Sequence, residues 1–373
     1  MSSNPPQAAL RNTPLNHLHE QLGATFTEFA GWRMPLRYSG DIAEHNAVRN
    51  SAGLFDLTHM GEIRITGRQA AEAMDYALLA NASAIRVGRA RYTMLCDVEG
   101  GVLDDLIVYR LDEQEFLVVA NAANAAVISD ALAKRVRYFD AKHEDVSDDF
   151  ALLAIQGPNA AAILAGLTTT NLDEVRYFAG YSSRVAGKDV LLARTGYTGE
   201  DGFELFTSPS DAPEVWQALF EAGAEHDLKP TGLACRDTLR LEAGMPLYGH
   251  ELSTELTPFH ANLGRLVKLD KPGDFVGKDA LSLVAPQPTR RTLVGLRGEH
   301  RRAPRHGYRV LDGEGAEIGT VTSGAPSPTL GHPIAMAYVD RDSAEPGTQL
   351  QVDIRGTAVP VTVVEMPFYK RSS

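Results

Sequence analysis

The segment 101–109, Gly-Val-Leu-Asp-Asp-Leu-Ile-Val-Tyr, restricts the fold of this chain more than any other. Its apolar residues are β-formers on both alternating faces, and Glu99-Gly100-Gly101 supplies a turn before it, so we expect a buried strand. Successive side chains of a strand point to opposite faces, which places Asp104 and Asp105 on different sides. One of the two acids must therefore share a face with apolar side chains.

A buried carboxylate is costly unless it has a partner or its pKa rises, and either outcome makes it a candidate site residue. The pattern is equally compatible with two acids that accept local hydrogen bonds at a strand end. Asp104 and Asp105 are therefore candidate site residues, and a purely structural role for both remains the alternative.

Composition narrows the class of protein. A chain of 373 residues with 44% hydrophobic and 23% charged residues is expected to form two or three globular domains. The net charge of -12 argues against nucleic acid or an anionic membrane as a partner. Cys96 and Cys235, the only cysteines, lack metal-ligand spacing, which favours free thiols in a reducing compartment. Without a long apolar run or a signal-like start, we expect a cytoplasmic protein.

Short motifs predict the main elements. Residues 102–110 and 115–121 are expected to form a hairpin, and strands at 189–195 and 203–206 flank a glycine-rich loop without dinucleotide or P-loop spacing. Thr231 is expected to cap a helix over 232–243. After Pro286 the pattern changes to short strands separated by glycine, which suggests a small β-barrel. The six expected barrel strands are 292–296, 308–311, 317–322, 335–339, 349–354 and 358–364.

Few residues carry a recognisable chemistry. None of the 11 histidines has metalloprotease spacing and no serine lies in a nucleophile elbow. His59 is read as a structural histidine. Glu204 lies between apolar neighbours on an expected strand, and a solvent-facing position in an alternating strand explains it as well as a functional role does. The simplest role of Arg236 is an ion pair with Asp237 or Glu242. Together the acids and the guanidinium would suit a ligand with amide-like donors at one end and a carboxylate at the other.

Several segments resemble, in order and over nearly the whole chain, the aminomethyltransferase (T-protein) family of the glycine cleavage system. They are 29–32, 55–60, 100–108, 194–202, 232–249 and 321–328. The resemblance implies an α+β fold of three domains arranged as a cloverleaf around a central folate cavity. On this basis we expect residues 1–284 to form the folate-binding aminomethyltransferase region. Its two intertwined α+β subdomains would be approximately 1–50 with 145–284, and 51–144, and residues 285–373 would form the β-barrel.

The family also implies a reaction. An aminomethyl group on the lipoyl arm of the H-protein meets tetrahydrofolate as co-substrate, giving 5,10-methylenetetrahydrofolate, ammonia and dihydrolipoyl H-protein, and no metal is required. The second acid of the matching Leu-Asp-Asp-Leu segment, Asp105, is the implied catalytic residue. The implied folate-binding residues are Glu204, Arg236, Tyr369, Tyr92, Asn121 and Met60.

Other readings remain. Folate-binding proteins that maintain iron-sulfur clusters share the fold without transferring an aminomethyl group, but the region 271–279 lacks the cysteine of their motif. A folate domain detached from a demethylating flavoprotein is a second alternative. Such a chain could not carry out the oxidation itself, because no flavin-type Gly-x-Gly-x-x-Gly follows an expected strand. A non-catalytic paralogue that only binds folate is the third alternative.

One basic stretch is not explained by the resemblance. Six arginines crowd it, opposed only by Glu299: Arg290, Arg291, Arg297, Arg301, Arg302 and Arg305. A solvated strand-loop surface is the simpler reading. A docking patch for an acidic carrier or a polyglutamate tail is the alternative.

Overall fold

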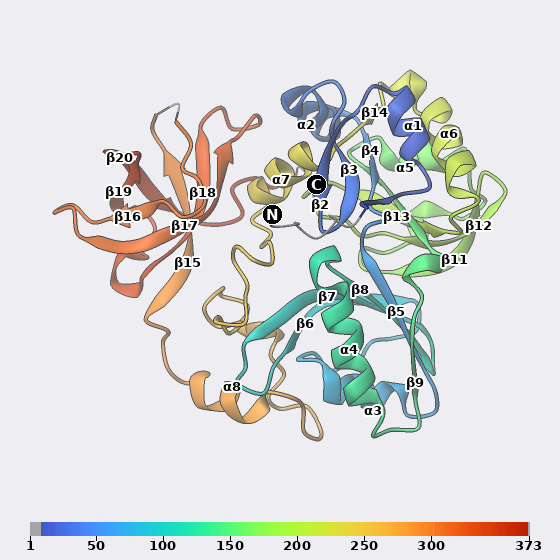
Figure 1. Cartoon of the computed structure of the whole chain (residues 1–373), viewed down its shortest axis with the longest axis horizontal. Helices are drawn as coiled ribbons and strands as arrows, with labels where there is room; N and C mark the ends of the chain where they lie inside the picture. The colour runs from blue at the N-terminus through green and yellow to red at the C-terminus, as the bar shows by residue number, and fades with distance from the viewer. Residues whose placement is uncertain (1–8, 301, 372–373) are drawn as a thin grey trace, which may run out of the picture.

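The computed structural model describes residues 9–300 and 302–371, which form three lobes around the centre of the molecule (Figure 1). Each lobe is built around its own sheet or barrel, and helices cover the sheets of two of them. This arrangement confirms the expected three-lobed α+β architecture with a C-terminal barrel. Within the described part of the chain, no helix is both long and apolar enough to cross a membrane.

The first lobe contains a six-stranded sheet of order β11-β12-β13-β10-β4-β14. Its strands are β4 (Gly53–Asp56), β10 (Ala151–Gln156), β11 (Gly180–Val185), β12 (Lys188–Ala193), β13 (Gly202–Thr207) and β14 (Lys229–Pro230). The central strand β10 is buried at every position, because both faces of the sheet are covered. Leu153 and Ile155 face one core, whereas Leu152 and Ala154 face another.

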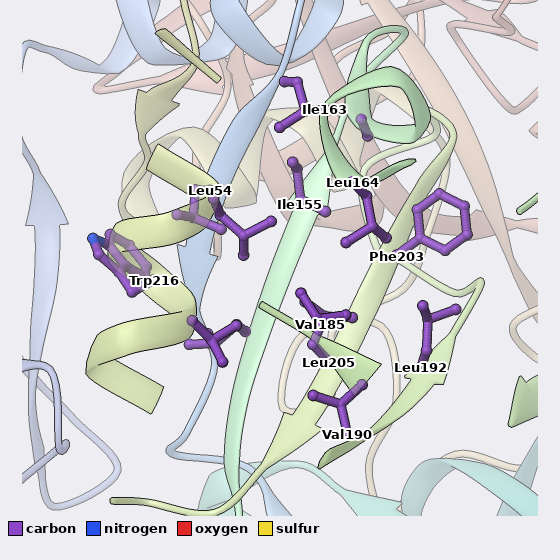
Figure 2. Packing of buried hydrophobic residues seen from close by; sticks show 14 of the residues in the cluster. Leu54, Ile155, Ile163, Leu164, Val185, Val190, Leu192, Phe203, Leu205 and Trp216 are labelled. Atoms are coloured by element: carbon purple, nitrogen blue, oxygen red, sulfur yellow. The ribbon is translucent and has the colours of Figure 1, made fainter. Parts of the chain in front are cut away.

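Helices α1 (Asn16–Gln21), α5 (Ala160–Ala165) and α6 (Ala212–Ala222) contribute to the core on one face of this sheet. Helix α6 turns Val215, Trp216 and Leu219 inward, the three-to-four-residue spacing that puts apolar side chains on one helical face. Figure 2 shows Trp216 beside Leu54 and the apolar residues of the neighbouring strands. Truncating such a buried tryptophan would cost about 3–5 kcal/mol.

The second lobe contains a five-stranded sheet of order β6-β7-β8-β5-β9. Its strands are β5 (Gly61–Thr66), β6 (Arg89–Cys96), β7 (Val102–Asp112), β8 (Glu115–Ala120) and β9 (Lys142–Asp145). Helices α3 (Ala70–Ala77) and α4 (Ala125–Val136) pack on one face. The other face meets the six-stranded sheet, where Tyr109 and Val119 pack with Leu152 and Phe206.

Strand β7 therefore divides two environments. Leu106 and Val108 join the core beneath α3 and α4, whereas Tyr109 joins the core between the two sheets. Because side chains alternate, Asp104 points with Leu106 toward the helices and Asp105 points with Tyr109 toward the other sheet. The expected hairpin of β7 and β8 is confirmed. The burial of the two acids agrees with their expected separation, since Asp104 is fully buried and Asp105 is only partly buried.

The third lobe is a closed six-stranded barrel of order β15-β18-β17-β16-β19-β20. Its strands are β15 (Arg291–Gly298), β16 (Arg309–Leu311), β17 (Glu317–Pro326), β18 (Pro333–Asp340), β19 (Gln349–Ile354) and β20 (Thr357–Val364). All six expected segments are strands, because alternation over short runs between glycines is a strong strand signal. Valines and other aliphatic residues fill the barrel interior.

Three further helices and a small sheet complete the longer elements. They are α2 (Asp41–Asn50), α7 (Leu233–Glu242), α8 (Lys278–Val284) and the sheet of β1 (Arg11–Asn12), β2 (Thr25–Phe29) and β3 (Trp32–Arg37). Helix α7 begins at Leu233 after an N-cap at Gly232. The expected Thr231 cap is wrong, because that hydroxyl donates instead to the carbonyl of Leu54 on β4. We retain as a proposal the division of the chain into 1–284, with its two subdomains, and 285–373.

Candidate active site

A cavity of about 300 Å³ lies at the edge of the interface between the two sheets. Strands β6, β7 and β8 form one side, β10 and β13 another, and residues 195–197 and 244–246 contribute loops. Its wall is mostly apolar with a few polar groups, the usual composition of a site for a small organic ligand. Six of the seven residues expected in the site line it: Met60, Tyr92, Asp105, Asn121, Glu204 and Arg236.

Asp105 faces this cavity from β7, and both of its carboxyl oxygens are hydrogen-bonded. The Tyr92 hydroxyl donates to Oδ2 at 2.9 Å, and Asn121 Nδ2 donates to Oδ1 at 3.0 Å. Loss of solvent and the charge of Asp104 raise the pKa of Asp105 to about 7, against the lowering effect of the Tyr92 bond. Asp105 can therefore exist in both protonation states near neutral pH, as a general acid or base requires.

Glu204 lies on β13, with its carboxylate at the cavity wall. Oxygen Oε2 accepts hydrogen bonds from the Thr195 hydroxyl and, at 3.4 Å, from the Tyr109 hydroxyl. Burial raises the pKa of Glu204, although the Thr195 bond and the charge of Arg236 oppose the rise. Both hydrogen bonds reach the same oxygen, so Oε1 remains the acceptor for a ligand.

Arg236 reaches the cavity from α7, with its guanidinium 4.8 Å from the centre of the Tyr197 ring. Burial lowers the pKa of Arg236. The ion pair expected from the sequence is wrong for the described residues, because Asp237 pairs with Arg240 and Glu242 pairs with Arg49. A guanidinium in a cavity wall without an ion pair is suited to a ligand acceptor group or to stacking on a flat ring.

Tyr369 is the one expected site residue that the structure does not place in the cavity wall. Its ring lies 4.1 Å from the Arg49 guanidinium, and its backbone N–H donates to the Glu242 carbonyl at 2.8 Å. The C-terminal segment is thereby fixed to α2 and α7. Tyr369 belongs to the contact between the barrel and the first lobe.

The cavity also contains aromatic residues that the sequence did not single out, namely Tyr109, Tyr177, Phe178 and Tyr197. Phe178 has a backbone φ of 56°, an unusual conformation for a bulky residue. Hydrogen bonds to Arg194 and Ala90 hold its backbone between the sheets. Tyr197 lies in the glycine-rich loop, a motif that could have identified it as a candidate from the sequence. No local pattern predicts that Phe178 lines the cavity.

His59 lies in the sequence between Leu57 and Met60, which line the cavity, but it is buried and does not line the cavity itself. Its ring packs edge-on against Phe29 with centroids 5.4 Å apart, and burial together with the charge of Arg236 lowers its pKa to about 4. A neutral, packed histidine agrees with the structural reading made from the sequence.

The basic stretch on the barrel is partly neutralised. Arg290 and Arg291 both approach Asp340, at 3.8 Å and 3.2 Å, and Arg305 donates to the Gly324 carbonyl. Arg301 lies outside the described residues. Among those residues, no group of three or more His, Cys, Asp or Glu is arranged to hold a metal ion.

Comparisons with known proteins agree with this architecture. Residues 15–271 match the GCVT N-terminal domain family, and residues 291–370 match the glycine cleavage T-protein C-terminal barrel domain family. An aminomethyltransferase of Saccharopolyspora erythraea is 78% identical over 97% of this chain and 99% of its own length. Another, from Thermus thermophilus, is 47% identical over 96% of this chain and 99% of its own length. The crystal structure of glycine cleavage system aminomethyltransferase T from Bartonella henselae has a TM-score of 0.91 at 38% identity, covering 97% of this chain and 98% of that one.

Proposed function

The chain belongs to the glycine cleavage T-protein family, and we propose that its central cavity is where tetrahydrofolate receives the carbon carried by a lipoylated H-protein. The protein is an aminomethyltransferase of the glycine cleavage system. The family uses tetrahydrofolate as a substrate. We propose which residues of this chain act on tetrahydrofolate and which protein delivers the aminomethyl group.

One observation carries the assignment of the site. Three residues that are far apart in the sequence line a single cavity, from a strand of each sheet and from α7. They are Asp105, Glu204 and Arg236. This gives two carboxyl groups and a guanidinium around an apolar, aromatic space. A reduced pterin has the complementary shape and chemistry: a flat ring, N–H donors on one edge and amines on the other.

We assign pterin binding to Glu204 and Arg236. A carboxylate can accept hydrogen bonds from the N–C–N edge of the ring, and Thr195 and Tyr109 hold the Glu204 carboxylate in place for that contact. Arg236 can stack on the ring or donate to its carbonyl. Tyr92, Asn121 and Met60 would border the ligand. Tyr369 would act at a distance, by fixing the C-terminal segment.

Asp105 is the proposed catalytic residue. As ammonia leaves the aminomethyl carbon, that carbon becomes cationic and the folate amine attacks it, so a carbon–nitrogen bond forms and a proton must leave the attacking nitrogen. The sulfur–carbon bond then breaks and the second folate nitrogen closes the methylene bridge. The proton lost by that nitrogen ends on the sulfur, which leaves as a thiol, and the proton lost by the first nitrogen replaces the one that ammonia takes as it leaves. A carboxylate with a pKa of about 7 can stabilise the cation and accept the proton. Positioning the two large reactants together should supply most of the rate gain.

The iron-sulfur maintenance alternative is not favoured. Relatives that share 78% and 60% of the sequence over nearly the whole chain are aminomethyltransferases. The lipoylated H-protein as partner, and the cytoplasm as location, remain predictions from the family and the composition.

The experiment is to measure ammonia release from aminomethyl-loaded H-protein with and without tetrahydrofolate. We expect a rapid release that requires folate, and formation of 5,10-methylenetetrahydrofolate in equal amount. Unloaded H-protein serves as the control. Folate binding without any folate-dependent ammonia release would reject the transferase assignment.

A further inference from the structure

Asp104 lies directly behind the proposed catalytic Asp105, on the opposite face of β7. It is fully buried, with 0% of its surface exposed, and it is absent from the cavity wall. No substrate can reach it there. A fully buried carboxyl group is costly, so its retention beside the site requires an explanation.

Three N–H donors surround the Asp104 carboxyl. The Asn121 backbone donates to Oδ2 at 2.9 Å, Asn121 Nδ2 donates to Oδ1 at 2.9 Å, and Asn124 Nδ2 donates to Oδ1 at 2.8 Å. Burial raises the pKa of Asp104, and these three bonds oppose that rise. An ionised carboxylate accepts all three bonds, whereas a protonated carboxyl would lose acceptor capacity. The donor set therefore fits the charged form.

The Asn121 side chain connects the two acids. Besides Asp104, its Nδ2 reaches Asp105 Oδ1 at 3.0 Å and the Asp105 carbonyl at 3.1 Å. One amide group thus contacts both carboxyl groups, and Asp104 holds that amide from behind. Any change in Asp104 will reach Asp105 through Asn121.

We propose that Asp104 is a positioning residue for the aminomethyl transfer: it fixes Asn121, thereby orients the Asp105 carboxylate, and its negative charge makes Asp105 a stronger proton acceptor. The inference rests on the proposed catalytic role of Asp105. It assigns to the first acid of the doublet a task distinct from that of the second.

The other groups around Asp105 do not supply this effect. Tyr92 approaches from β6, Tyr197 from the loop after β12, and Tyr248 from the segment after α7. Burial raises the pKa of each of these tyrosines, so they are neutral near pH 7. Arg236 lines the same cavity, but its guanidinium lies against the Tyr197 ring. Asp104 is the neighbouring group whose negative charge opposes ionisation of Asp105.

The test is Asp104→Asn, which keeps the size of the side chain and removes its charge. Turnover at saturating aminomethyl-loaded H-protein is measured against pH, with the KM for tetrahydrofolate at each pH. We expect the acidic limb of the kcat profile to move at least about one pH unit lower, because a neighbouring negative charge has been lost. We also expect kcat on the alkaline plateau to fall by severalfold, up to about tenfold for each pH unit of that shift, because Asp105 becomes a weaker base. The KM for folate should stay within about twofold, because Asp104 does not touch the cavity.

Asn124→Ala is the matched control, since it removes one bond to Asp104 and keeps both charges. Its acidic limb should remain at the wild-type pH. If Asp104→Asn left the limb in place as well, Asp104 would be merely structural and the inference would be wrong.

Should Asp104→Asn fail to fold, Asp104→Ser removes the same charge with a smaller polar side chain. Its acidic limb should also move to lower pH, because the charge that raises the pKa of Asp105 is gone; an unmoved limb overturns the inference. Asp105→Asn distinguishes the proposed catalytic role of Asp105 from the proposed positioning role of Asp104. Normal turnover of that variant would reject the catalytic role of Asp105, whereas its inactivity beside an unshifted Asp104→Asn profile would reject only the role of Asp104.

Discussion

Glu204→Gln should weaken tetrahydrofolate binding by an amount that follows from the hydrogen bonds of this residue. In the structure, Oε2 of Glu204 already accepts from Thr195 and Tyr109, which leaves Oε1 as the free acceptor for the pterin. The substitution keeps the shape of the side chain but removes its charge. The expected loss is therefore that of one charge-assisted hydrogen bond.

Such a bond contributes about 1.5–3 kcal/mol. At about 1.4 kcal/mol per factor of ten, the dissociation constant should rise between about 10-fold and about 150-fold. We expect the upper part of this range. If the amide oxygen keeps the Thr195 and Tyr109 bonds, its NH₂ group faces the N–H donors of the pterin.

The assay is an equilibrium titration of tetrahydrofolate into each variant at about pH 8, because burial raises the pKa of Glu204 and an alkaline pH favours its carboxylate form. Tyr109→Phe is the matched control, since it keeps the Glu204 carboxylate and removes a hydroxyl that contacts Thr195 at 2.9 Å and Glu204 at 3.4 Å. It should weaken binding less than Glu204→Gln does, because the charged acceptor remains. Turnover of Glu204→Gln at saturating folate should remain close to that of the wild type. Wild-type affinity in Glu204→Gln would refute the assignment of Glu204 to the pterin edge.

Three further predictions concern catalysis and stability. Asp105→Asn should bind tetrahydrofolate normally but lose most turnover, as comparison of folate titrations with ammonia release will show; normal turnover would remove Asp105 from the mechanism. Because the pKa of Asp105 in the free protein is about 7 and its carboxylate is the active form, kcat/KM should fall as the pH drops through about 7, and a flat kcat/KM profile across that pH would contradict this assignment. Arg49→Met leaves Glu242 buried without its guanidinium partner and should lower the free energy of unfolding in urea by about 3–5 kcal/mol. Arg68→Met, at an exposed ion pair, should cost less than about 1 kcal/mol, and equal losses in the two variants would contradict the buried network.

The sequence predicted the elements that depend on local pattern. The hairpin of β7 and β8 and all six barrel strands follow from alternation and turn residues, which act over a few positions. The opposite directions of Asp104 and Asp105 follow from the geometry of any strand. Local pattern did not decide which acid would face a cavity, because that depends on the packing of the second sheet.

Other features depend on contacts between distant segments. Arg236 lacks the expected ion pair because Arg49, on α2, approaches Glu242 and Arg240 turns to Asp237. Thr231 bonds Leu54 because β4 passes beside it. Tyr369 lies against Arg49 instead of the cavity because the C-terminal segment crosses α7. Apart from the Arg240–Asp237 pair, which lies within α7, nothing within a few residues of these positions encodes such approaches.

A crystal structure of the protein with tetrahydrofolate would show where the pterin binds. We predict the pterin ring between the two sheets, with its N–C–N edge at Glu204 and its reactive amines within reach of Asp105. Density for the pterin at any other place on the molecule would contradict it.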